Sequence, residues 1–447
     1  MRFTAVAALT TIIIVGFAAH AIVITYFPIQ KTLGDEASYT LEAHRILDTG
    51  ATSLVPGHMI FHHRPPLGFG YFALYAQPEL IRNPQAQKWI IDRPHDTWSQ
   101  EMGRFVQRVS FSNLCLLSIA TILIFLLCRE CGFGPPASLL AAALMMLNPR
   151  TGFYVQSIWP EILHLTLLLA GFWAFALALR KEHDGQIGRL VGWLLLCGVL
   201  LGYARLTRGV VGPFVWVMAA LAAWFVFRSE LPRTQNTRAG CSVLAAVVLL
   251  ISFNATLLPQ KIANRQDHGT PLIGHNTWRN IEGGIGRTAD YPAQYMNAAP
   301  DPMTREQLAK ERILTRVLDR PFSETLAQQT SVFFWRLGYS YVDRGFTVNR
   351  WRGRGAESFF ARATTLFSWT IFVAGLLGLA FRGFGSRAGA TLSLFTLYYV
   401  AGLLIVIPNT RMFIQLVPLL LIFTAGALDG TIRAVSNRHE FRSRLEA

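Results

Sequence analysis

The sequence predicts an all-α polytopic membrane protein with about ten transmembrane helices and two long extracytoplasmic loops that contain interfacial helices. Of its 447 residues, 52% are hydrophobic and only 15% are charged, and the mean hydropathy is +0.35. Soluble domains carry about 25% charged residues. This composition therefore excludes a soluble globular protein and indicates many membrane spans.

Ten apolar runs carry this prediction, and each is expected to form one transmembrane helix. They cover residues 4–27, 106–128, 135–148, 160–180, 189–204, 209–227, 239–258, 360–381, 388–407 and 412–433. The first begins like a cleavable signal peptide, but its apolar residues continue to Phe27, so we expect an uncleaved helix.

Basic residues gather on one side of the predicted membrane. Arginines dominate the connectors 129–134, 180–189, 228–238 and 382–387 and the C-terminal tail. This bias is typical of the cytoplasmic side, so the net charge of +15 points to membrane lipid and not to nucleic acid as the partner. The long loops, residues 28–105 and 259–359, are then expected on the opposite side.

Three acidic residues are expected on that opposite side. Asp35 and Glu36 directly follow the first span, and Glu161 opens the fourth. Charges beside an apolar helix end are costly and need a reason. Asp35 could cap a helix from Ala37 to about Leu47, but a cap explains one carboxylate and not the pair. The helix dipole alone also accounts for Glu161.

Three arginines share this side against the usual charge rule, namely Arg205, Arg208 and Arg411. Each could serve only as an anchor for lipid headgroups. Together with the acids they indicate an active site, in which carboxylates accept a proton and guanidinium groups bind a phosphate.

The sequence resembles the GT-C superfamily of polytopic glycosyltransferases, in the branch of the protein O-mannosyltransferases and the lipid A aminoarabinose transferase. Five short motifs carry the resemblance: Gly34-Asp-Glu-x-x-Tyr39, Arg64-Pro-Pro-Leu67, Tyr154-x-Gln156-Ser-x-x-Pro-Glu161, Leu206-Thr-Arg208 and Pro259-x-x-x-x-Asn264. The motifs follow one another in a consistent order, and the resemblance covers most of the chain from about residue 5 to 430. This is expected for a single transmembrane domain across 1–447.

The resemblance implies transfer of a sugar from a polyprenyl-phosphate donor to an extracytoplasmic lipid, glycan or protein, with an acid of the first loop as general base. Our choice for that base is Asp35, oriented by Glu36 or Glu161. The expected phosphate ligands are Arg205, Arg208 and Arg411, and the expected acceptor or donor contacts are Tyr39, Arg64 and Gln156. We expect such an enzyme in a bacterial inner membrane, with its site facing the periplasm or exterior.

An argument independent of the resemblance supports this donor class. No cytoplasmic connector is long enough for a nucleotide-sugar domain, so an activated sugar would have to arrive on a lipid. The sequence indicates no certain cofactor. A divalent metal held by Asp35 with His58, His62 and His63 stays open, although their spacing is not diagnostic.

The main alternative is a transporter or flippase of lipid-linked saccharide, and a membrane scaffold is a third possibility. A transporter predicts charges in mid-span and matched broken helices in two halves. Here the charges lie at the ends of spans, which favours the enzyme. The sequence leaves the sugar, the acceptor and the oligomeric state open.

Overall fold

The structure, a computed structural model, describes residues 3–26, 36–49, 66–76, 100–180, 186–229, 235–268, 271, 273, 307–308, 310–315, 322–338, 354–405 and 410–446. Every secondary-structure element within these ranges is a helix. The prediction of an all-α protein is therefore confirmed.

Eight helices in the described ranges are long and apolar enough to cross a membrane. They are α1 (Phe3–Tyr26), α6 (Gln100–Glu130), α9 (Glu161–Ala178), α10 (Ile187–Thr207), α12 (Gln235–His268), α18 (Arg354–Arg382), α19 (Arg387–Ile405) and α20 (Leu416–Glu446). The other two predicted spans form the shorter apolar helices α7 (Pro135–Met146) and α11 (Val211–Phe227). The protein is thus a multi-pass membrane protein.

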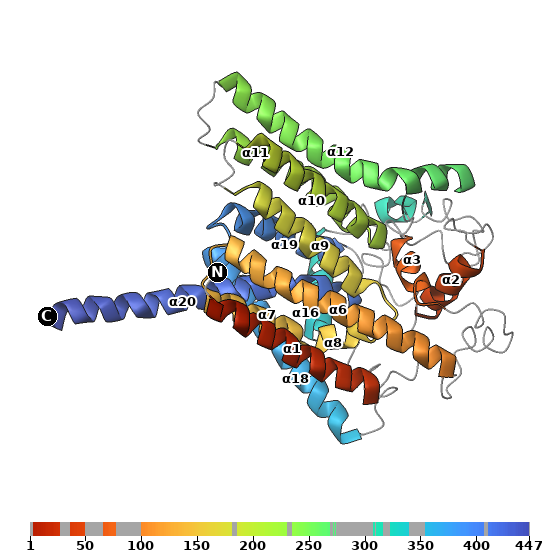
Figure 1. Cartoon of the computed structure of the whole chain (residues 1–447), viewed down its shortest axis with the longest axis horizontal. Helices are drawn as coiled ribbons and strands as arrows, with labels where there is room; N and C mark the ends of the chain where they lie inside the picture. The colour runs from red at the N-terminus through yellow and green to blue at the C-terminus, as the bar shows by residue number, and fades with distance from the viewer. Residues whose placement is uncertain are drawn as a thin grey trace.

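Two helices run well past the apolar runs that predict them. α12 ends at His268 with Pro259 inside it, and α20 ends at Glu446. Hydropathy marks only the part of a helix that lies in lipid, whereas the backbone hydrogen bonds continue wherever helix-forming residues follow. In Figure 1 the end of α20 projects beyond the rest of the bundle.

The helix ends that the predicted cytoplasmic connectors join lie at one end of the bundle, where both termini also lie (Figure 1). Hydrogen bonds tie them together there. The backbone N–H of Gly134 donates to Asp429 Oδ1 at 2.7 Å, and Arg387 Nη1 donates to the carbonyl oxygen of Leu179 at 2.9 Å. The described helices of the two long loops therefore belong to the opposite end of the bundle.

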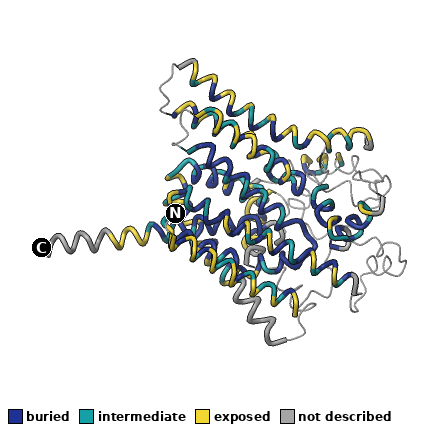
Figure 2. Tube along the Cα trace, viewed as in Figure 1, coloured by how far each residue is buried: buried dark blue, intermediate teal, exposed yellow. Residues whose placement is uncertain are grey.

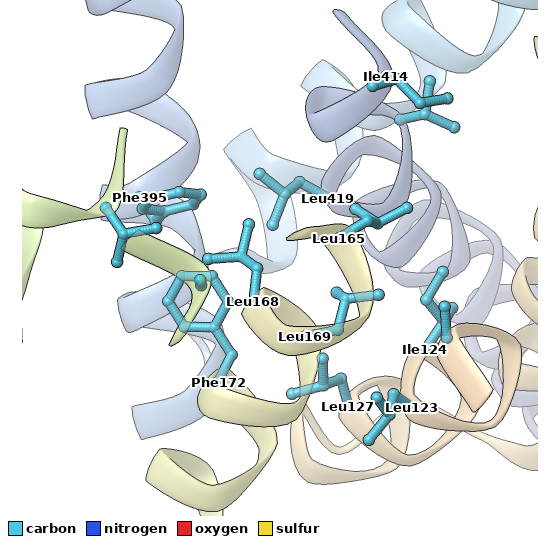
Figure 3. Packing of buried hydrophobic residues seen from close by; sticks show 14 of the residues in the cluster. Leu123, Ile124, Leu127, Leu165, Leu168, Leu169, Phe172, Phe395, Ile414 and Leu419 are labelled. Carbon is cyan, nitrogen blue, oxygen red and sulfur yellow. The ribbon is translucent and has the colours of Figure 1, made fainter. Parts of the chain in front are cut away.

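α9 lies at the centre of the bundle, whereas α1 and α12 present exposed apolar faces (Figure 2). Figure 3 shows Leu165, Leu168 and Phe172 of α9 packed between Leu127 of α6 and Phe395 of α19. Close packing on all sides makes α9 a rigid support for residues at its ends. Its first residue is Glu161, at the end that receives the loops.

Shorter helices lie toward this end of the bundle, and α2 and α3 are on the right in Figure 1. They are α2 (Glu36–Thr49), α3 (Leu67–Ala73), α8 (Pro149–Val155), α16 (Phe322–Gly338) and the 3₁₀ helix η3 (Thr410–Gln415). α2 matches the helix expected from Ala37 to about Leu47, and α16 begins directly after Pro321, as a proline in the first turn favours.

Candidate functional site

The candidate site is built around residues 156–160, the turn between α8 and α9, here called the 156–160 turn. Asn113 of α6 holds its start, because Asn113 Nδ2 donates to the carbonyl oxygens of Val155 and Ser157 at 3.1 and 3.2 Å. The hydroxyl of Tyr71 in α3 donates to Asn113 Oδ1 at 2.9 Å. One buried amide thus joins α3, α6 and the turn that leads into α9.

Glu36 connects α2 to the same turn. The backbone N–H of Ile158 donates to Glu36 Oε1 at 2.9 Å, and Glu36 is only 1% exposed. A charged acceptor makes such a hydrogen bond strong. The second acid of the Asp-Glu pair therefore positions the chain that leads to Glu161.

α3 packs closely on the end of the turn. A Cβ at Gly68 would lie 2.9 Å from Pro160 Cβ, so only glycine allows this approach. Tyr39 of α2 packs beside it, with its ring centroid 4.8 Å from that of Phe69. Tyr39 and Gln156, the first residue of the turn, are both buried.

Glu161 and Arg208 form a buried ion pair where α9 begins and α10 ends. Arg208 Nη2 donates to Glu161 Oε1, and the two side chains are 11% and 0% exposed. Tyr399 of α19 interacts electrostatically with both. Among the described residues, nothing accepts a hydrogen bond from Arg208 Nε. The guanidinium group therefore keeps one donor that the pair does not use.

A buried ion pair is a poor source of stability, because removing both charges from water costs about as much as their attraction returns. The pair at Glu161 and Arg208 is therefore better explained by function. An arginine with an N–H to spare is suited to bind an anion, above all a phosphate.

Arg205, one turn earlier on α10, is directed elsewhere. Its Nη2 donates to the carbonyl oxygen of Ile273 at 3.3 Å. The guanidinium group also lies against Gly209 and Gly212 of the turn after α10. Arg205 thus packs on this turn and connects it to the segment after α12, and its hydrogen bond does not go to Glu161.

Comparisons with known proteins bear on the fold that carries these residues. The oligosaccharyltransferase AglB from Archaeoglobus fulgidus, in complex with an inhibitory peptide and a dolichol-phosphate, has a TM-score of 0.52 at 14% identity, over 100% of this chain and 52% of that chain. The Archaeoglobus fulgidus oligosaccharyltransferase in complex with Zn and sulfate gives 0.51 at 14% identity, over 97% and 51%. Residues 63–265 match the family model described as dolichyl-phosphate-mannose-protein mannosyltransferase. Over these residues the chain is similar to that family, and its fold is similar to that of the two oligosaccharyltransferases.

The predicted resemblance to the GT-C superfamily is thereby confirmed. The chain spans about half the length of the two oligosaccharyltransferase structures. ArnT from Cupriavidus metallidurans aligns with a TM-score of 0.39 at 16% identity, over 93% of this chain and 76% of that chain. No curated protein matches the sequence.

Several predicted site residues of this GT-C fold lie outside the described residues. They are Asp35, Arg64 and the side chain of Arg411, whose backbone belongs to η3. The same holds for His58, His62 and His63, on which the metal alternative depends. Within the described residues, no three His, Cys, Asp or Glu side chains are grouped to hold a metal ion.

The sequence analysis missed two polar residues of the site. His164 follows Glu161 by three residues and Thr207 precedes Arg208, and both are buried. The spacing of Glu161 and His164 was the available signal, because residues three apart on a helix share a face. The apolar run 160–180 surrounds His164, and hydropathy alone gives a residue inside such a run no separate role.

Proposed function

We propose that this GT-C protein is a glycosyltransferase that moves a sugar from a polyprenyl-phosphate donor to an extracytoplasmic acceptor. The observation that carries the proposal is the buried guanidinium group of Arg208. Its Nη2 donates to Glu161, whereas no described residue accepts a hydrogen bond from its Nε–H. The matched family description names a dolichyl-phosphate sugar, and AglB was solved with dolichol-phosphate, which supports this donor class.

In the proposed reaction, the carboxylate of Asp35 takes the proton from the acceptor hydroxyl or amine. The acceptor atom attacks the anomeric carbon with inversion, and the bond from that carbon to the phosphate oxygen breaks. The polyprenyl phosphate leaves with the electron pair. General-base help of this kind contributes about 10²–10⁴ in rate.

Arg208 meets the charge that develops on the departing phosphate, with Arg411 proposed as its partner. One well-aimed donor of this kind contributes about 3 kcal/mol to transition-state stabilisation. Glu161 keeps the guanidinium group in place in the absence of donor. Glu36 positions the 156–160 turn by accepting the hydrogen bond from the backbone N–H of Ile158. Tyr39, Arg64 and Gln156 are proposed to line the donor or acceptor region, and Arg205 to support the turn beside it.

The transferred group is proposed to be a hexose or a pentose, and the acceptor a lipid, a glycan or a protein. We place the enzyme in a bacterial inner membrane with the site toward the periplasm, because the arginine-rich connectors lie at the other end of the bundle. A divalent metal in the first loop is an additional possibility, and no step of the reaction depends on it.

The test compares cell-envelope glycans and lipids by mass spectrometry in cells with and without the gene. Cells that lack it should miss one sugar residue on a single envelope component and accumulate the polyprenyl-phosphate sugar. Re-expression of the natural chain should reverse both changes, and Asp35→Asn should not. An intact envelope, or a block in saccharide translocation with normal transfer in extracts, would support the transporter alternative.

A further inference from the structure

His164 is a fully buried residue of α9 to which the proposed reaction gives no role. Its Nδ1 lies 3.0 Å from the carbonyl oxygen of Ala204 in α10. A carbonyl oxygen can only accept, so Nδ1 carries the hydrogen and donates it. In the neutral ring the lone pair is then on Nε2, and among the described residues no group donates to Nε2.

The carbonyl oxygen of Ala204 lies in the last turn of α10. It accepts hydrogen bonds from the backbone N–H of Arg208 at 2.9 Å and from Thr207 Oγ1 at 2.7 Å, besides the one from His164. Arg208 itself is extended, with φ −153° and ψ 139°. The chain therefore leaves the helix at the residue whose guanidinium group forms the site.

Glu161 and His164 hold this helix end from the same side. They are three residues apart on α9, so both face α10. Glu161 binds the guanidinium group of Arg208, while His164 binds the carbonyl that fixes the Arg208 backbone. Through these two contacts α9, most of whose residues are buried, reaches both the guanidinium group of Arg208 and the carbonyl that its backbone N–H binds.

We propose that His164 is a positioning residue, which holds the end of α10 through its Nδ1–H so that Arg208 meets the donor phosphate. This inference rests on the proposed function, because it assumes that Arg208 binds the phosphate. It assigns the role to Nδ1 and not to Nε2, and this distinction can be tested by substitution.

Substitution of His164 by asparagine or by glutamine distinguishes the roles of the two ring nitrogens. His164→Asn keeps an N–H donor near the position of Nδ1, whereas His164→Gln places its amide near the position of Nε2, and His164→Leu removes both. His20→Leu is the matched control, since His20 Nε2 donates to the carbonyl oxygen of Met146 at 2.8 Å and so also joins two helices, through a partly buried imidazole. Arg208→Lys reports on the phosphate site itself.

The full-length variants are purified in detergent and tested for binding of undecaprenyl phosphate and dolichyl phosphate by native mass spectrometry. The KM for the donor and kcat are measured separately. His164→Leu and His164→Gln should weaken phosphate-lipid binding and raise the donor KM about tenfold, the effect of losing about one hydrogen bond. His164→Asn should restore both values to within about threefold. His20→Leu should lower thermal stability and leave the donor KM unchanged.

Rescue by glutamine and not by asparagine would overturn the inference in favour of a direct ligand contact by Nε2. Wild-type binding in both His164→Gln and His164→Leu would also overturn it, provided that Arg208→Lys binds poorly. Wild-type binding in Arg208→Lys would instead show that Arg208 does not bind the donor phosphate, which the proposed function assumes. If His164→Leu does not fold, the comparison of asparagine with glutamine decides the question.

Discussion

The carboxylate of Glu36 accepts a hydrogen bond from the backbone N–H of Ile158, a residue 122 positions later in the chain. Ile158 lies three residues before Glu161, the first residue of α9. The first acidic segment and the third acid are therefore connected by one buried bond.

The first prediction concerns this bond. Glu36→Gln keeps an acceptor oxygen for the Ile158 N–H, so its kcat should stay within about threefold of the natural enzyme. Glu36→Ala leaves that N–H buried without its partner, at a cost of about 1–3 kcal/mol. Both its midpoint of thermal unfolding and its kcat should fall. Equal losses in the two variants would show that the charge of Glu36 takes part in the chemistry.

The second prediction concerns Asp35. Asp35→Asn keeps the shape of the side chain and removes the proton acceptor, so transfer should drop by about 10²-fold or more. Membrane insertion and binding of the polyprenyl-phosphate donor should be normal. Turnover is measured with the donor identified by envelope mass spectrometry, and Glu36→Gln serves as the neighbouring control. Full turnover in Asp35→Asn would leave Asp35 as a helix cap only.

The spans were predictable because the signal is local. A run of apolar residues reports its own environment, and each of the ten runs has a helix that corresponds to it. The sequence also indicated that Glu161 and Arg208 share one side of the membrane. It could not pair them, because they lie on different helices and their contact depends on how α9 packs against α10.

The 156–160 turn shows a second limit. A short polar and aromatic stretch between two apolar runs is typical of an exposed loop, but the structure buries Ser157, Ile158 and Trp159. The cover comes from α2 and α3, which belong to the first long loop. Partners that are more than a hundred residues apart cannot be inferred from hydropathy or periodicity, so neither the burial nor the bond to Glu36 was predictable.

The third prediction concerns phosphate binding. Arg208→Lys keeps the positive charge but not the planar set of N–H donors that serves Glu161 and a phosphate together. The donor KM should rise about tenfold or more with near-normal expression. Arg180→Lys is the matched control, because Arg180 Nε donates to Glu130 Oε2 at 2.9 Å in a similar pair at the opposite end of the bundle. Unchanged donor affinity in both variants would reduce Arg208 to a structural anchor.

The fourth prediction concerns topology. Single cysteines near residues 90 and 300, in a background without the five native cysteines, should react with a membrane-impermeant thiol reagent from outside the inner membrane. Cysteines near 185, 235 and 440 should react only after the membrane is opened, since arginine-rich connectors are retained on the cytoplasmic side. Labelling of 235 and 300 from the same side would contradict the ten-span arrangement and the shared outward site.

The last prediction concerns pH and the packing of α2. His44 is fully buried, its Nδ1 donates to the carbonyl oxygen of Thr40 at 2.7 Å, and its ring lies 4.9 Å from that of Phe105 in α6. Burial lowers the pKa of His44 below its usual value of 6.5, with the bond to Thr40 opposing. The unfolded segment then binds more protons than the folded one, so the stability of α2 is complete above about pH 6.5 and declines as the pH falls below it.

Glu42 on the same helix acts with the opposite sign. Burial raises the pKa of Glu42 above 4.5, with Arg45 opposing, so its contribution to stability falls as the pH rises.

A variant distinguishes the contribution of His44 from that of Glu42. His44→Phe keeps the ring packing against Phe105 and removes the titrating nitrogens. The protection of the α2 amides from hydrogen exchange, corrected for the intrinsic rate, should decline between pH 7.5 and 5.5 in the natural protein. It should stay level or increase toward low pH in His44→Phe. The same decline in both proteins would show that His44 does not control the docking of α2.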